Sequence, residues 1–132
     1  AIINNEDKPN VLCVCAVGVN RSKYLASYLK EKGYSTKYGG IDFRREGEYN
    51  PLTKKAVEWA DVIIIVRKRL ESIFRAKFNT DKKVIVLDVT DSKKLLPESH
   101  KHLAQLPFKQ FQEQWTRPLL QKAIEPYLPL KK

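Results

Sequence analysis

The sequence predicts an α/β fold built on a doubly wound parallel sheet that is flanked by helices. Short apolar runs alternate with segments whose apolar residues recur at helical spacing, which is the pattern of strand–helix–strand units. The run at 62–66 is continuously β-branched, as a strand buried on both faces requires. A chain of 132 residues with 42% hydrophobic content is long enough for one core and too short for two, so residues 1–132 are expected to form a single domain.

The chain opens with a polar segment and a strand–loop–helix unit. Residues 1–9 are polar and are expected to form a loose lead-in. Residues 11–14 are apolar and lie between a proline and a loop, which predicts a buried strand. A helical pattern follows over residues 22–32, and Gly33 is suited to end that helix.

A second strand and helix are expected next. Residues 34–38 predict a strand, which the glycines at 39–40 should break before an irregular, charged stretch at 41–49. Asn50 is expected to cap the following helix, with a proline in its first turn, and that helix should end near Asp61.

The remaining elements continue the alternation and end in helices. A helix is expected around residues 70–78 and a strand at 84–87. Residues 97–106 and 108–128 should be helical, the second segment being interrupted or kinked at Pro118. Ligands of doubly wound sheets bind outside the carboxyl ends of the strands, so the loop after the first strand lies where a ligand is expected.

That loop joins a cysteine and an arginine that are separated by five residues. A loop of this length can curl until its N–H groups point inward, forming an anion site at the N-terminus of the next helix. The same N–H groups stabilise a thiolate, which places Cys15 as a nucleophile below a phosphate, while Arg21 holds two phosphoryl oxygens. The expected phosphate-binding residues are Ala16, Val17, Gly18, Val19, Asn20 and Arg21.

Two further residues support this chemistry. Gly18 supplies the left-handed backbone geometry that the loop needs. Ser22 can donate its hydroxyl to the sulfur of Cys15 and ease its departure from a phosphocysteine intermediate. We therefore expect a cysteine-dependent phosphomonoesterase. The competing interpretation is that Cys15 is a small buried apolar side chain and Arg21 a solvated residue at a helix start.

The composition favours anionic partners. Twenty-five Lys and Arg residues against 15 Asp and Glu residues give a formal net charge of +10, which steers a phosphorylated protein or another anionic phosphomonoester toward the molecule. Nucleic acid is a less favoured partner on charge alone. No apolar run approaches the roughly 20 residues of a membrane span, and the two cysteines are too close for an ordinary disulfide. A cytoplasmic protein without a membrane partner is expected.

Three segments resemble the low-molecular-weight protein tyrosine phosphatases. They are residues 11–22 with the loop, residues 59–64, and residues 86–91, and the resemblance covers most of residues 10–106. It implies a four-stranded parallel sheet with a phosphate-binding loop after the first strand, no metal or organic cofactor, and hydrolysis of phosphotyrosine through a phosphocysteine.

In that family an aspartate on a late loop protonates the leaving group and then activates water. Asp88 and Asp91 both follow the last expected strand, although neither lies in the family's usual Asp-Pro-aromatic sequence. Asp91 is the preferred general acid because it lies further from the strand, and Asp88 is the second choice. The structural alternative for either carboxylate is that it caps a turn or a neighbouring helix.

Other functions stay open at this stage. Asn20 before Arg21, and the stretch that follows the first helix, resemble a nuclear phosphatase that acts on phosphoserine, so serine phosphate is an alternative substrate. A catalytically weak phosphate-binding or RNA-binding module on the same fold is the second alternative. One residue separates Cys13 from Cys15, and one residue separates His100 from His102. Two such separate pairs are weak support for a zinc site, so no metal is expected.

Overall fold

The computed structural model describes residues 8–42, 49–90 and 92–131, and its centre is a parallel sheet. The sheet has four strands in the order β2-β1-β3-β4, and every neighbouring pair is parallel. This confirms the expected doubly wound architecture. The strands are β1 (Asn10–Cys15), β2 (Ser35–Gly40), β3 (Val62–Ile65) and β4 (Lys83–Val86).

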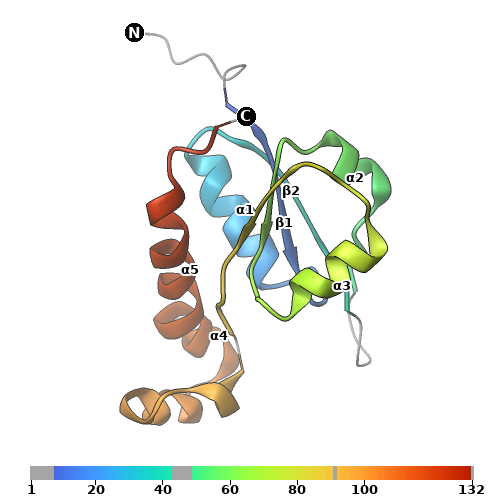
Figure 1. Ribbon diagram of the computed structural model, residues 1–132. Coiled ribbons are helices and arrows are strands. Elements are labelled where there is room, and N and C mark those ends of the chain that lie inside the picture. Colours follow the sequence, from blue (N-terminus) through green and yellow to red (C-terminus); the bar gives the residue numbers. More distant parts are fainter. Residues whose placement is uncertain (1–7, 43–48, 91, 132) are drawn as a thin grey trace, which may run out of the picture.

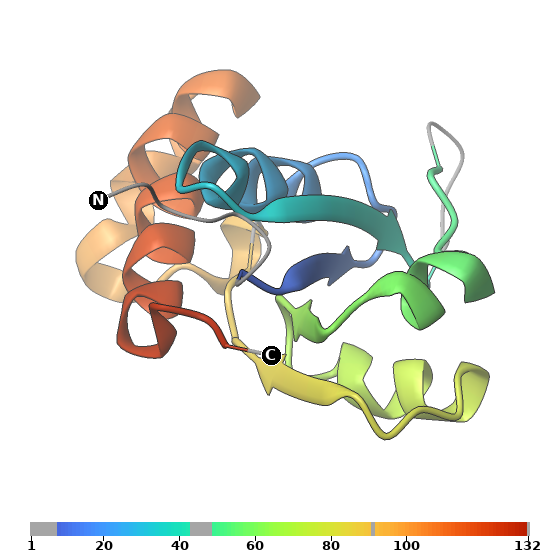
Figure 2. The same cartoon turned by 90° about the horizontal axis from the view of Figure 1, so that it is seen from above.

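Helices cover both faces of the sheet (Figure 1). The helix α1 (Arg21–Glu31) and the helix α5 (Arg117–Ile124) pack together on one face. The helices α2 (Lys54–Trp59) and α3 (Leu70–Lys77) lie on the other, as the view from above shows (Figure 2). The sheet is therefore the middle layer of three.

Alternating side chains of the two inner strands divide the core between these faces. In β1, Cys13 packs with the cluster under α1 and α5, whereas Leu12 and Val14 pack under α2 and α3. In β3, Ile63 and Ile64 are fully buried on opposite faces. The continuous β-branched run is thus a central strand, as its composition predicts.

A separate helical segment lies beyond the carboxyl end of β4 (Figure 1). It has its own small core of Leu96, Leu103 and Phe111. The expected helix at 97–106 is a 3-10 helix at Glu98–Gln105, preceded by a shorter one at Lys93–Leu95. The helix α4 (Phe108–Phe111) then continues through a π-helical turn at Gln112–Thr116 into α5.

The last helix departs from α-helical geometry at Gln112–Thr116, before Pro118 and not at the proline itself. Pro118 lies in the first turn of α5 and has no N–H to donate, and its ring crowds the carbonyl group four residues earlier. The backbone widens at that point, and the N–H of Arg117 donates to the carbonyl of Gln112 in a π-type bond. A final 3-10 turn covers Glu125–Tyr127.

Two expectations about the segment after α1 are wrong. The glycines at 39–40 do not break the strand before residue 39 but form the last two residues of β2, because their missing Cβ atoms let Leu52 and the loop after β1 approach the strand closely. Asn50 does not cap α2, which begins at Lys54 after the N-cap Thr53. The Thr53 hydroxyl accepts the N–H of Ala56 at 3.1 Å.

The ends of other elements agree with the sequence. Gly33 follows α1 with a φ of +99°, the conformation expected of a glycine that ends a helix. Of the expected lead-in at 1–9, residues 1–7 lie outside the described residues. Pro9 is buried, and the Lys8 ammonium group donates to the carbonyl of Lys32. Across the described part of the chain, no helix combines the length and apolar character of a membrane span.

The position of the α2 cap is testable. We expect Thr53→Ala to lower the free energy of unfolding by about 1 kcal/mol, because it leaves the N–H of Ala56 without its hydroxyl acceptor. Thr53→Ser, which keeps the hydroxyl, should recover most of this loss. Urea unfolding of the three proteins provides the measurement. Equal stability of Thr53→Ala and the wild type would contradict the cap.

Candidate active site

The loop after β1 occupies the end of the sheet to which the strands point (Figure 1). The strand β1 ends at Cys15 and α1 begins at Arg21, so the residues 16–20 form the whole connection. The structure therefore brings the two ends of the cysteine–arginine motif to the carboxyl end of a central strand, where ligands of such sheets bind.

Four consecutive carbonyl oxygens of this loop are hydrogen-bonded on its outer side. The donors come from the end of β2 and from the segment that precedes α2. The bonds run from Ile41 N to Cys15 O at 3.2 Å, from Asp42 N to Ala16 O at 2.9 Å, from Asn50 N to Val17 O at 2.9 Å, and from Asn50 Nδ2 to Gly18 O at 3.3 Å.

This outer bonding orients the amides. In a trans peptide the N–H points away from the preceding C=O, so outward carbonyls at 15–18 turn the N–H groups of residues 16–19 to the inner side. The N–H of Gly18 donates to the Cys15 Sγ at 3.2 Å, which shows that the inner side is the side of the sulfur. The inner side of the loop is therefore lined by N–H groups, the arrangement found in concave anion-binding loops.

Cys15 lies at the base of this concave loop beside a hydroxyl group. Its Sγ is 3.0 Å from the Oγ of Ser22, which is fully buried in the first turn of α1. Cys15 itself is only 1% exposed. A hydroxyl at this distance can donate to a sulfur anion and stabilise it.

Arg21 closes the other end of the loop and is also buried. Its Nη1 donates to the carbonyl of Val89 at 2.8 Å, which ties the guanidinium group to the segment that follows β4. This bond fixes the side chain in one orientation beside the loop. Arg21 is 7% exposed, so its charge is largely shielded from bulk water, and such shielding strengthens the attraction of a cation for a nearby anion.

Gly18 has a φ of +75°, the left-handed conformation that the sequence analysis expects. A Cβ at this position would lie 2.5 Å from the carbonyl oxygen of Asn50 and from the amide nitrogen of Gly40. A Cβ on Gly40 would in turn lie 2.4 Å from the carbonyl carbon of Val17. Loop and strand therefore touch backbone to backbone.

Cys13 differs from Cys15 although it lies only two residues away. It is fully buried in the core under α1 and α5. Burial, and next the neighbouring charge of Cys15, raise the pKa of the Cys13 thiol far above its ordinary value. Cys13 is therefore a neutral thiol at physiological pH and is not a second nucleophile.

The two candidate general acids are Asp88 and Asp91. Asp88 is exposed, and its Oδ1 lies 3.5 Å from Nε of Arg67 and accepts the N–H of Lys68 at 3.3 Å. Its carboxylate therefore holds the turn after β3, which is the structural role weighed for it from the sequence. Asp91 lies outside the described residues.

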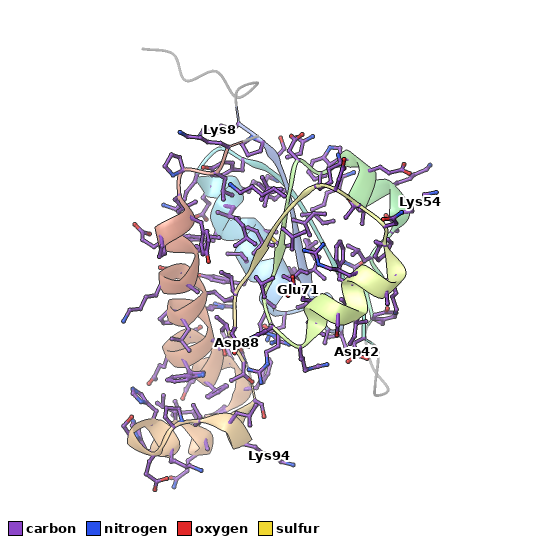
Figure 3. The ribbon with its side chains drawn as sticks, viewed as in Figure 1. Lys8, Asp42, Lys54, Glu71, Asp88 and Lys94 are labelled. Carbon is purple, nitrogen blue, oxygen red and sulfur yellow. The ribbon has the colours of Figure 1, made fainter. Side chains whose placement is uncertain are left out.

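Three polar side chains near the loop escaped the sequence analysis. The Nη1 of Arg69, after β3, is 2.7 Å from Oδ2 of Asp42, after β2. This ion pair links the segments on both sides of β1, and Figure 3 shows Asp42 and Asp88 at the same end of the sheet. The third is the buried Gln112, whose Oε1 accepts the side-chain N–H of the loop residue Asn20 at 3.1 Å. Nothing local marks these pairs, because their members are far apart in the chain.

The cysteine and histidine pairs do not come together as a metal site. Cys13 and Cys15 are in β1, whereas His100 and His102 stack on each other on an exposed 3-10 helix. Among residues 8–42, 49–90 and 92–131, no three Cys, His, Asp or Glu side chains gather as metal ligands would.

Together, Cys15, Ser22, Arg21 and the inward N–H groups can perform one kind of chemistry. The sulfur of Cys15 lies beside the Ser22 hydroxyl and the N–H of Gly18, and the guanidinium of Arg21, at the other end of the loop, is bonded to the carbonyl of Val89. These are the parts that transfer of a phosphoryl group to sulfur requires.

The fold is shared with solved phosphatase structures, although no family model and no curated protein matches the sequence. The tyrosine phosphatase AmsI of Erwinia amylovora is 12% identical, with 93% of each chain covered and a TM-score of 0.63. The YwlE arginine phosphatase of Geobacillus stearothermophilus is 17% identical, with 94% of this chain and 98% of that chain covered and a TM-score of 0.54.

A third similar structure also matches this chain over most of its length. A low-molecular-weight protein tyrosine phosphatase from Bacillus subtilis is 16% identical, and the match covers 89% of this chain and 97% of that one with a TM-score of 0.55. All three matches run through nearly the whole length of both chains. The chain therefore has the fold of the low-molecular-weight protein tyrosine phosphatases.

Proposed function

We propose that the protein is a cysteine-dependent phosphomonoesterase that acts on phosphorylated proteins, with phosphotyrosine as the first substrate to test. One observation carries the proposal, namely the 3.0 Å contact between Cys15 Sγ and Ser22 Oγ beside the loop. The carbonyl oxygens of that loop accept hydrogen bonds on its outer side, which leaves its N–H groups facing the sulfur. A buried structural cysteine needs neither the hydroxyl partner nor the amide-lined anion site.

In the first step the Cys15 thiolate attacks phosphorus. A bond forms between sulfur and phosphorus while the bond from phosphorus to the ester oxygen breaks. The inward N–H groups and the guanidinium of Arg21 stabilise the charge on the equatorial oxygens as the transition state forms. The ester oxygen leaves with a proton from a general acid.

In the second step a water molecule attacks the phosphocysteine. The sulfur–phosphorus bond breaks, inorganic phosphate is released, and the sulfur recovers its negative charge. The Ser22 hydroxyl donates to that sulfur at the distance already present in the structure. The general acid of the first step, now a carboxylate, takes the proton of the attacking water.

Asp91 is proposed as this general acid, with Asp88 as the second candidate. The bond from Arg21 to the carbonyl of Val89 supports a general acid on this segment, because it anchors the chain between the two aspartates beside the loop. Asp88 is occupied by Arg67 and by the N–H of Lys68. Its carboxylate would have to leave both partners to reach a substrate.

The proposed substrate class follows from charge and from the similar structures. A net charge of +10 favours association with acidic phosphoproteins. One similar structure is named a tyrosine phosphatase and another an arginine phosphatase. Phosphotyrosine, phosphoarginine and phosphoserine are therefore the three substrates to compare.

The nucleophile is tested first. We expect Cys15→Ser to lower turnover of para-nitrophenyl phosphate by at least roughly a thousandfold, because a serine hydroxyl is a much weaker nucleophile in this site. The control, Cys13→Ala, should keep turnover within a few-fold of the wild type, since Cys13 is a buried neutral thiol. Steady-state kinetics provide the measurement. Equal turnover by Cys15→Ser and the wild type would contradict the proposal.

The general acid is tested with two leaving groups. Asp91→Asn should lower kcat for phenyl phosphate by about 10²–10⁴-fold and lower it less for para-nitrophenyl phosphate, whose leaving group departs readily without a proton. Asp88→Asn should have a small effect on both substrates, because its carboxylate is paired with Arg67. The opposite ranking of the two variants would assign the role to Asp88.

The substrate class is tested with three peptides of identical acidic sequence. They carry phosphotyrosine, phosphoserine or phosphoarginine at the same position, and release of phosphate from each gives kcat/KM. We expect the phosphotyrosine peptide to be the best substrate by at least about tenfold. A higher kcat/KM for either of the other two peptides would replace phosphotyrosine in the proposal.

A further inference from the structure

We propose that Asn50 is a positioning residue that holds the phosphate-binding loop in its anion-binding shape. The inference rests on the proposed function, because it concerns the same loop. Asn50 lies between the described end of β2 and the start of α2, and it is 29 positions beyond Arg21 in the sequence. The sequence suggests a helix cap there, and the structure gives that role to Thr53.

Asn50 contacts the loop through both its backbone and its side chain. Its backbone N–H donates to the carbonyl of Val17 at 2.9 Å. Its side-chain Nδ2 donates to the carbonyl of Gly18 at 3.3 Å. Asn50 thus supplies two of the four outer bonds of the loop, on the two consecutive peptide units that flank the Cα of Gly18.

Asn50 is itself anchored to β2 on its other side. Its carbonyl accepts the N–H of Gly40 at 2.8 Å, and the same side-chain nitrogen also donates to the carbonyl of Tyr38 at 3.1 Å. The amide group therefore bridges the edge strand and the loop. Neither an alanine nor an aspartate at this position can donate from the side chain to both carbonyl oxygens.

The two peptide units that Asn50 holds are important for the chemistry. The carbonyl of Val17 belongs to the same peptide unit as the N–H of Gly18, which points at the Cys15 sulfur. The carbonyl of Gly18 belongs to the same unit as the N–H of Val19. If either unit rotated, its carbonyl oxygen would replace an N–H at the anion site and repel a phosphate.

Gly18 explains why an outside residue is needed. A glycine has no side chain with which to hold its own peptide units, and it loses more conformational freedom on ordering than any other residue. Its φ of +75° is thus stabilised from outside, by backbone contact with Gly39 and Gly40 and by the bonds of Asn50. The side-chain amide of Asn50 provides directional bonds that packing alone does not.

The test compares Asn50→Ala with Thr53→Ala. Both substitutions remove a hydrogen-bonding side chain from the same short segment, but only Asn50 contacts the loop. We expect Asn50→Ala to lower kcat/KM for para-nitrophenyl phosphate by roughly tenfold to a hundredfold and to weaken binding of inorganic phosphate by at least about fivefold. Thr53→Ala should leave both quantities within twofold of the wild type.

Two further variants separate positioning from simple stability. Asn50→Asp keeps the shape of the side chain but sets a carboxylate against two carbonyl oxygens, so we expect at least as large a loss as in Asn50→Ala. Asn50→Ser keeps one donor and should recover part of the lost phosphate affinity. Thermal unfolding should place the Asn50→Ala and Thr53→Ala proteins within a few degrees of each other, so that lost stability does not explain lost activity.

The outcomes distinguish the positioning role of Asn50 from the proposed function. Wild-type turnover and phosphate affinity in Asn50→Ala, or wild-type affinity in Asn50→Asp, would overturn the positioning role and leave the phosphatase function standing. A wild-type protein that binds phosphate but hydrolyses no phosphomonoester would overturn the function, and phosphate affinity of the variants would then decide the role of Asn50. A wild-type protein that binds no phosphate would overturn both.

Discussion

The site depends on hydrogen bonds that face away from it. A short loop can present its N–H groups to an anion only if its carbonyl groups are satisfied elsewhere, because a buried carbonyl oxygen without a donor is costly. Here the donors are Ile41, Asp42 and Asn50, which come from the end of β2 and the chain that follows. The hydrogen bonds on the outer side of the loop thus determine which groups face its inner side. The edge strand β2 and the chain after it are therefore part of the site, as the cysteine is.

The same constraint explains several features of the surrounding structure. Gly39 and Gly40 allow β2 to lie against the loop with no intervening side chain. The ion pair between Asp42 and Arg69 joins the segments after β2 and β3 across the end of β1. Arg21 is bound to the carbonyl of Val89, so the segment after β4 is connected to the loop as well. The chain at the carboxyl end of every strand therefore takes part in a connected polar frame around Cys15.

The two cysteines illustrate how environment separates identical side chains. Cys13 and Cys15 point to the same face of β1, yet only Cys15 is at the end of the strand, where the N–H of Gly18 and the Ser22 hydroxyl contact the sulfur. Two residues earlier, burial among apolar side chains keeps the Cys13 thiol neutral. Polar partners, and not exposure, distinguish them, since both are almost completely buried.

The sequence by itself determined the order of strands and helices, the central place of the β-branched run, and the Cys15–Arg21 loop with Gly18 and Ser22. These are local properties, because hydrophobic period and motif spacing act between residues that are close in the chain. Only the tertiary structure decided that Asn50 bonds to the loop instead of capping a helix, that Gly39 and Gly40 stay within β2, and that Gln112 meets Asn20. Those contacts join segments that are distant in sequence, and local propensity yields when a buried carbonyl or a close backbone approach offers more stabilisation.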